Sequence, residues 1–324
     1  MKKLILTLAL VSCGHPPSED APQPSTKDIQ KEYFDASNRA ITQFLDHSRI
    51  VDRGQDGSAQ GVGDSLIFSG LALFGLPCDL GSVIENQIIS EIDSLQGGLM
   101  RHPVYEPNDA SLDGALGLYF GIADRISRCS GSIEKWTPAI KKHMDFVDSN
   151  SQRLNPKSNS ILTKEFDYVL HLMAYKMGVR NKPSNDTKLL LGLEIGEWAR
   201  ATMVAKKGCF RINLGLLALK TIEMLGESHA NIVKNNFCDA TKDSQLPTTD
   251  HYCGRTDMKQ WIQDFKYNVW EYRHQRCGLF ETPDAGGMKT PAIDYLVALR
   301  TVYQPLALPT LVDKSKEVST KTTH

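Results

Sequence analysis

The residues best suited to chemistry gather in one segment of the chain, residues 96–114. This segment combines two glycines with a cation, an imidazole, a phenol and several carboxylates, and Pro103 and Pro107 stiffen its backbone. A loop of this kind holds polar side chains at a fixed place on a scaffold, where they can bind a ligand. We therefore expect three of its side chains to contact a substrate: Arg101, His102 and Tyr105.

The position of His102 favours a loop function. The residue lies directly before Pro103, which favours an extended backbone over a buried position in a helix. Next to Arg101, its imidazole is suited to binding an acidic group or to transferring a proton. The alternative is a surface histidine that only makes hydrogen bonds.

Two aspartates in this segment have the spacing of an acid–base pair. If Asn108 caps a helix, Asp109 lies in its first turn and Asp113 lies one turn later on the same face. Two carboxylates placed so repel each other, which raises the pKa of one toward that of a general acid. The alternative is structural: Asp109 then complements the helix dipole, and Asp113 pairs with Arg101.

Three further aspartates lie where other helical segments begin. Asp64 follows a glycine-rich loop, and Asp284 and Asp294 precede the last apolar segment. If these segments meet around one cavity, acids from several of them face it, as the acid and base on the two sides of a glycosidic bond must. Each aspartate is also explained as a helix cap or a dipole partner. The candidate catalytic residues are Asp113, Asp109, Asp64 and Asp294, with Asp284 as a substrate contact.

Sharper motifs are missing from the sequence. It contains no HExxH, GxSxG, Walker A or GxGxxG pattern, which argues against zinc peptidases, serine hydrolases and nucleotide enzymes. It also contains no CxxC pair. We expect neither a metal site nor a cofactor.

Two kinds of helical segment alternate from Ile29 onward. One kind is apolar on all sides, which predicts burial on all sides, and the other is amphipathic, which predicts one solvated face. The apolar segments are too short to span a bilayer. The apolar segments are Ser65–Leu76, Leu112–Ile122, Tyr168–Met177, Leu214–Leu225 and Tyr295–Val302, and the amphipathic ones are Ile29–Leu45, Leu80–Leu95, Ile133–Val147, Lys188–Val204 and Met258–His274.

The alternation repeats and predicts an all-α fold. A polar residue opens each apolar segment at intervals of about 50 residues, with a longer last interval, and the alternation typical of strands is not sustained. Inner helices that are buried on every side, alternating with outer helices that have one solvated face, are what a closed ring of helical hairpins requires. The arrangement resembles, over residues 29–305, the (α/α) toroid of glycoside hydrolases, polysaccharide lyases and related carbohydrate-active enzymes. The opening residues are Asp64, Asp113, Asp167, Asn213 and Asp294.

This resemblance implies that the loops before the inner helices line one end of a central cavity and that the ligand is a glycan. One hypothesis is a hydrolase- or lyase-like enzyme that degrades a polysaccharide or peptidoglycan, with the acidic residues at the cavity mouth. The alternative is a non-catalytic protein that binds a glycan or a protein partner.

The N-terminus points to export. Lys2 and Lys3 give the chain a basic start, and the apolar run Leu4–Val11 follows. This is the form of a signal peptide. Leu10-Val11-Ser12-Cys13 resembles the lipobox of bacterial lipoproteins, which implies cleavage before Cys13 and lipid attachment to that residue. The alternative is an ordinary signal peptide with a chance cysteine nearby. The predicted parts are a signal peptide (1–12), a lipidated cysteine and flexible tether (13–28), a toroid domain (29–312) and a disordered tail (313–324).

Composition and charge bound the partners and the location. With 37 Lys and Arg against 38 Asp and Glu, and no basic cluster, nucleic acid is a poor partner. The predicted partner is instead a membrane, reached through the lipid anchor. Many lipoproteins retained at the inner membrane have Asp directly after the cysteine, whereas this chain has Gly14, which favours the outer membrane. We therefore expect a periplasmic or surface-facing protein of the bacterial envelope.

The cysteines fit an oxidising compartment. The chain has 7 cysteines, and lipidation of Cys13 leaves an even number for up to three disulfides. Cys78 and Cys129 each follow an apolar helical segment, so we expect them to pair. The alternative is that several cysteines are buried free thiols.

Overall fold

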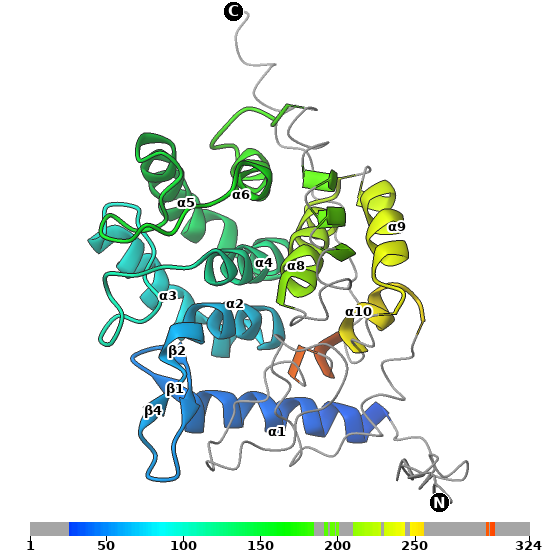
Figure 1. Ribbon diagram of the computed structural model, residues 1–324. Coiled ribbons are helices and arrows are strands. Elements are labelled where there is room, and N and C mark those ends of the chain that lie inside the picture. The colour runs from blue at the N-terminus through cyan, green and yellow to red at the C-terminus, as the bar shows by residue number, and fades with distance from the viewer. Residues whose placement is uncertain are drawn as a thin grey trace, which may run out of the picture.

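The computed structural model describes residues 26–184, 191–193, 195–197, 199–200, 210–227, 230–243, 247–255, 296–297 and 299–301. Over these residues the chain is mostly helical, which confirms the all-α class (Figure 1). The helices are α1 (Thr26–Phe44), the short 3-10 helix η1 (Val62–Asp64), α2 (Ser65–Gly75), α3 (Cys78–Ser94), α4 (Leu112–Arg128), α5 (Ser132–Ser149), α6 (Lys164–Lys176), α8 (Phe210–Met224), α9 (Ala230–Ala240) and α10 (Pro247–Tyr252).

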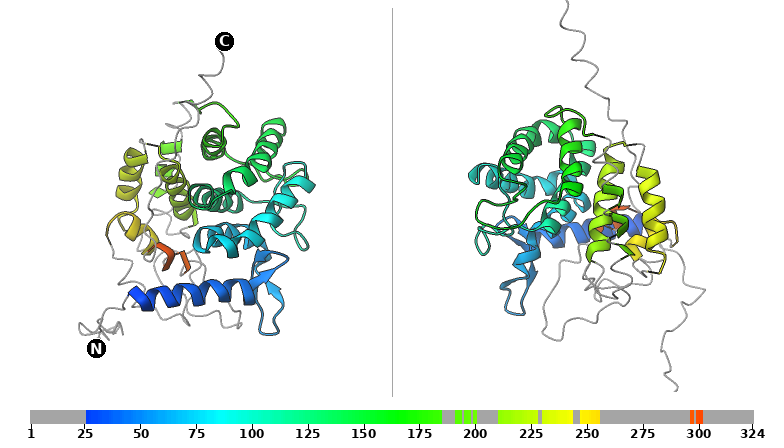
Figure 2. Two further views of the ribbon diagram at one scale, coloured as in Figure 1. Left: turned by 180° about the vertical axis from the view of Figure 1, so that it is seen from behind. Right: turned by 45° about the horizontal axis from the view of Figure 1, so that its top comes forward.

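Two small antiparallel hairpins connect α1 to α2. The first pairs β1 (Leu45–Asp46) with β2 (Arg49–Ile50), and the second pairs β3 (Asp52–Arg53) with β4 (Ala59–Gln60). The views from two sides show α1 along one edge of the molecule, below α2 in Figure 1, with the hairpins at its C-terminal end (Figure 2).

Helices α2 and α4 pack backbone to backbone in the core. A Cβ atom added to Gly70 of α2 would lie 2.2 Å from the carbonyl oxygen of Gly117, and one added to Gly121 would lie 2.2 Å from the carbonyl oxygen of Gly70. Such an approach is open only to glycine. Since Gly114 faces Leu66 while Gly121 faces Gly70, further along α2, the two helices run parallel. Nearly all of α2 is buried, as its apolar sequence predicts.

A buried carboxylate joins α3 to α4 and α5. Glu85 of α3 accepts hydrogen bonds from the guanidinium of Arg125 at 2.9 Å and from the indole N–H of Trp136 at 2.8 Å, and the ammonium of Lys135 lies 3.2 Å away. Burial alone would raise the pKa of Glu85, but these donors outweigh it and the pKa is lowered. The amphipathic helices α3 and α5 are therefore pinned to the apolar α4.

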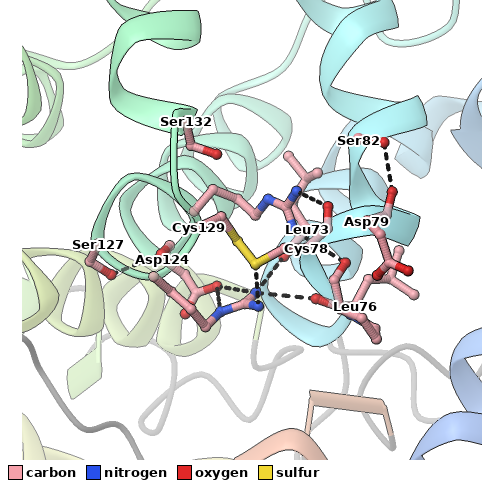
Figure 3. The surroundings of a disulfide bond; sticks show 12 residues. Leu73, Leu76, Cys78, Asp79, Ser82, Asp124, Ser127, Cys129 and Ser132 are labelled. Carbon is pink, nitrogen blue, oxygen red and sulfur yellow. Dashed lines mark hydrogen bonds and ion pairs between the residues drawn. A yellow bond between two sulfur atoms is a disulfide. The ribbon is translucent and has the colours of Figure 1, made fainter.

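The predicted disulfide between Cys78 and Cys129 is present, with a Cα–Cα distance of 5.7 Å. It joins the start of α3 to the end of α4, close to the C-terminal end of α2 (Figure 3). A second disulfide joins Cys238 of α9 to Cys253, just after α10, with a Cα–Cα distance of 5.5 Å. Cys209 and Cys277 lie outside the described residues.

Several predicted boundaries need correction. Helix α1 begins at Thr26, inside the predicted tether of residues 13–28. Helix α4 continues past Ile122 to Arg128, and α6 begins before the predicted Tyr168. The added turn of α6 is mostly polar and only partly buried, whereas the added residues of α4 are mostly buried, with Asp124 paired to Arg128 at 2.6 Å and Arg125 paired to Glu85 at 2.9 Å. Of the described helices, none has the length and apolarity needed to cross a membrane.

Candidate functional site

The loops that lead into α2 and α4 lie together. The hydroxyl of Ser65, the first residue of α2, donates a hydrogen bond to the carbonyl oxygen of Arg101. A Cβ atom added to Gly63 would lie 3.1 Å from the Arg101 guanidinium. The N–H of Arg101 in turn donates to the carbonyl oxygen of Asp109 at 2.8 Å. The segment rich in candidate residues is therefore held against the start of α2.

Arg101 and Asp109 form the centre of this loop. The Arg101 guanidinium lies 3.2 Å from Asp109 Oδ2 and 3.9 Å from Glu106 Oε2. Asp109 also accepts hydrogen bonds from the Ser158 hydroxyl at 2.6 Å and from the Ala110 N–H at 2.9 Å. Burial alone would raise the pKa of Asp109, but these hydrogen bonds and the charge of Arg101 lower it. Asp109 is therefore ionised at neutral pH.

The predicted cap of α4 was wrong, although the helix does begin at Leu112 like the predicted apolar segment. The cap is Ser111, whose hydroxyl accepts a hydrogen bond from the Gly114 N–H at 3.3 Å, and Asn108 and Asp109 lie in the preceding loop. Ser111 is the stronger cap because it directly precedes the apolar run, whereas Asn108 lies further from it. The carboxylate that pairs with Arg101 is consequently Asp109, and the alternative pairing with Asp113 is also wrong.

His102 is buried, contrary to the prediction for a loop residue: its exposed fraction is 0%. Its Nδ1 accepts hydrogen bonds from the backbone N–H groups of Val104 at 3.2 Å and Tyr105 at 3.3 Å. The proton therefore lies on Nε2, which faces Asp46 Oδ2 at 3.3 Å. Burial lowers the pKa of His102 more than Asp46 raises it. The neutral ring shapes the turn that follows it.

Tyr105 is the exposed member of this group. Its exposed fraction is 53%, and its ring packs against His102 with 4.7 Å between ring centroids. The turn built on His102 thus presents the phenol to solvent. Of the three predicted substrate contacts, Tyr105 is the most accessible.

Asp64 and Asp113 stand at the starts of neighbouring parallel helices. Asp64 occupies the N-cap position of α2, but its side chain makes no capping hydrogen bond. Asp113 lies in the first turn of α4, where Ser111 is the cap and the Asp113 carboxylate accepts from the adjacent Gly114 N–H at 2.9 Å. A capping hydrogen bond therefore does not explain Asp64, whereas Asp113 accepts an N–H group in the first turn of α4 and complements the helix dipole. Asp284, Asp294 and Cys13 lie outside the described residues.

The structure also contains a cavity that the sequence does not predict. It has a volume of about 570 Å³ and lies between α8, α9 and α10, near the C-terminal end of α2. The local signals were Lys220 and Glu223, two charged residues inside the mostly apolar segment Leu214–Leu225. The main residues that line the cavity are Phe74, Phe120, Lys220, Glu223, Lys234 and Tyr252.

The described residues contain no group of His, Cys, Asp and Glu side chains that could hold a metal ion. Comparison with known proteins gives no relative: no family model, curated protein or solved structure matches this chain.

Proposed function

We propose that this chain is an exported lipoprotein of the bacterial envelope, anchored through Cys13, whose helical domain is an (α/α) toroid that degrades a glycan. Two disulfides among the described residues support export, since such bonds persist in oxidising compartments. The parallel, buried α2 and α4, with the amphipathic α3 and α5 packed against them, support the toroid.

The observation that carries the enzymatic proposal is the common position of Asp64 and Asp113. Both lie at the N-terminal ends of adjacent parallel helices, and the side chain of Asp64 makes no capping hydrogen bond there. Two carboxylates at one end of a helical ring are what hydrolysis of a glycosidic bond requires. The exposed ring of Tyr105, on the loop between them in sequence, offers an apolar face for a sugar.

We assign the general acid to Asp113 and the base to Asp64. Asp109 is held ionised by Arg101 and its hydrogen bonds, so it cannot supply the proton and instead contributes a fixed negative charge. In the proposed reaction Asp113 protonates the glycosidic oxygen while Asp64 removes a proton from the attacking water. Asp294 stays a predicted alternative base, and Asp284 a predicted substrate contact.

The test is a cleavage assay of the full-length chain on peptidoglycan and common polysaccharides, read as new reducing ends. Asp113→Asn and Asp64→Asn should each abolish cleavage and leave the midpoint of thermal unfolding nearly unchanged. Asp35→Asn, at an exposed position on α1, is the matched control and should retain full activity. Cleavage that survives both active-site changes, or no cleavage by the unaltered chain, contradicts the enzymatic proposal.

A second candidate is a non-catalytic glycan-binding lipoprotein. Arg101, His102 and Asp109 make their polar contacts within the loop, which favours this candidate. Val104 and Tyr105 are then among the loop residues that are exposed to a ligand. Glycan binding that Tyr105→Ala weakens and Asp113→Asn preserves, without new reducing ends, would identify this function. Binding that depends on Asp113 would argue against it.

The lipid anchor has its own test. Cys13→Ala should move the protein from the membrane fraction to the soluble fraction and prevent incorporation of a palmitate analogue, because no other lipid site is proposed. Cys78→Ala, at a cysteine that forms a disulfide, should retain the label. Labelling that persists in Cys13→Ala would disprove the anchor without affecting the glycan proposal.

A further inference from the structure

The cavity beside α8 brings two lysines to one aromatic ring. The ammonium of Lys234 lies 4.3 Å from the centroid of the Tyr252 ring, and that of Lys220 lies 5.8 Å from the same centroid. These residues come from α8, α9 and α10, and all three line the cavity. Within the described part of the chain, neither ammonium has an ion pair with a carboxylate.

The carboxylates that line the cavity already have partners. Glu223 accepts a hydrogen bond from the Tyr252 hydroxyl at 2.8 Å. Glu227 lies 3.7 Å from the ammonium of Lys176 and 3.6 Å from that of Lys182. Glu223 carries a negative charge that attracts Lys220, but one carboxylate balances at most one of the two ammonium groups, and among the described residues neither Lys220 nor Lys234 forms an ion pair with a carboxylate.

Leaving these charges unpaired is unfavourable. Loss of hydration lowers the pKa of Lys220 most strongly, the charge of Glu223 opposes this, and the neighbouring Lys234 adds a smaller lowering, so that the pKa is about 8. A bound anion would supply the missing counter-charge, and the attraction would be strong because the site excludes much of the water.

Apolar side chains also line the cavity, beside the polar side chains of Asn231, His251 and Thr301. Phe74 of α2 and Phe120 of α4 stack with 4.7 Å between ring centroids and line one side, together with Met224 and Ala230. A volume of about 570 Å³ lies within the range typical of sites for small organic ligands. The cavity thus combines two neighbouring ammonium groups with several apolar side chains.

We propose that this cavity binds a small organic anion, whose carboxylate or phosphate group contacts Lys220 and Lys234 and whose apolar body packs against Phe74 and Phe120. The site is separate from Asp64 and Asp113, since it lies at the C-terminal end of α2 and they lie at the N-terminal ends of α2 and α4. It does not depend on the proposed glycan activity.

The test is calorimetric titration of the full-length chain with four probes: phenylacetate, phenyl phosphate, phenylacetamide and inorganic phosphate. Phenylacetate and its amide differ in charge and little in shape, so binding of the acid alone reports the lysines. Inorganic phosphate lacks the apolar body and should bind more weakly than phenyl phosphate. The two organic acids distinguish a carboxylate ligand from a phosphate ester.

Lys220→Met and Lys234→Met should each weaken binding of the preferred acid about tenfold or more. Lys31→Met, at an exposed lysine of α1, is the matched control and should bind as tightly as the unaltered chain. Lys234→Arg keeps the charge and should retain most of the affinity if Lys220→Met proves unstable. Equal binding of acid and amide, no binding of either acid, or unchanged affinity in both methionine variants would overturn the proposal.

Discussion

Among single residues, His143 links stability to pH most directly. Its ring is fully buried between α4 and the turn after α3, with Nδ1 2.5 Å from the carbonyl oxygen of Gly97 and Nε2 2.7 Å from the Tyr119 hydroxyl. Because the carbonyl only accepts, the proton lies on Nδ1 and Nε2 accepts from Tyr119. Burial of this neutral ring lowers the pKa of His143 from 6.5 to about 4.

We predict that the protein loses stability between pH 6.5 and pH 4 because of His143. In this range the unfolded chain binds a proton at this position and the folded chain does not, so the free energy of unfolding falls by about 3 kcal/mol toward the lower pH. Urea unfolding at pH 7 and pH 4.5 measures the change. In His143→Gln the dependence on pH should be weaker by most of this amount.

Other histidines do not obscure the comparison. His102 has a lowered pKa, so it also destabilises the folded protein as the pH falls. His171 has a pKa that Asp167 raises, so it stabilises the folded protein at low pH. Both are present in the unaltered chain and in His143→Gln, so they cancel in the difference. Equal pH dependence in the two chains would mean that His143 does not control it.

At the scale of elements, the glycine contact between α2 and α4 determines how closely these two helices pack. Gly70 meets the backbone of Gly117, which cannot move aside as a flexible side chain can. The contact keeps the starts of both helices, and so Asp64 and Asp113, at a fixed separation.

We predict that Gly70→Ala destabilises the protein by about 2 kcal/mol or more, because the new methyl group forces the two helix backbones apart. Gly196→Ala is the control: it lies in a described helical stretch, and none of the described residues has an atom within 4 Å of an added Cβ. That change should be neutral or stabilise by up to about 1 kcal/mol. Chemical unfolding of both variants gives the answer, and similar effects in the two would rule out the close contact as the cause.

The elements were predictable from sequence to different degrees. The alternation of apolar and amphipathic segments predicts α2 to α5 because it depends on residues within one helix. The cap residue of α4 was missed because several residues before the helix are good caps, and the sequence alone does not distinguish Ser111 from Asn108.

The candidate sites were likewise only partly predictable from the sequence. The grouping of residues 101–109 into one loop follows from sequence, but the burial of His102 does not, since it depends on Asp46 from a distant hairpin. The cavity beside α8 was missed for this reason: Lys220, Lys234 and Tyr252 come from three helices whose relative placement no local pattern reports.

At the scale of the whole molecule, each of the two disulfides among the described residues closes one helical hairpin. Cys78 and Cys129 are separated by 51 residues and Cys238 and Cys253 by 15 residues. The longer loop removes more freedom from the unfolded chain.

We predict that the double change Cys78→Ala and Cys129→Ala lowers the free energy of unfolding by about 4 kcal/mol, whereas loss of Cys238–Cys253 costs about 3 kcal/mol. Denaturant unfolding of the two double variants under oxidising conditions measures both. Under reducing conditions the unaltered chain should lose stability as well. A negligible effect of reduction would contradict the pairing.

The Cys78–Cys129 bond also determines how the chain responds to mechanical load. A protein held at one end and pulled at the other lengthens as its helices unravel, up to the contour length of the chain. These cysteines are 51 positions apart, and the chain between them cannot be drawn out, so about 180 Å of chain stays closed until the bond is reduced. Helices α3 and α4, and the residues 96–111 between them, therefore stay in one short covalent loop when the rest of the chain is drawn out.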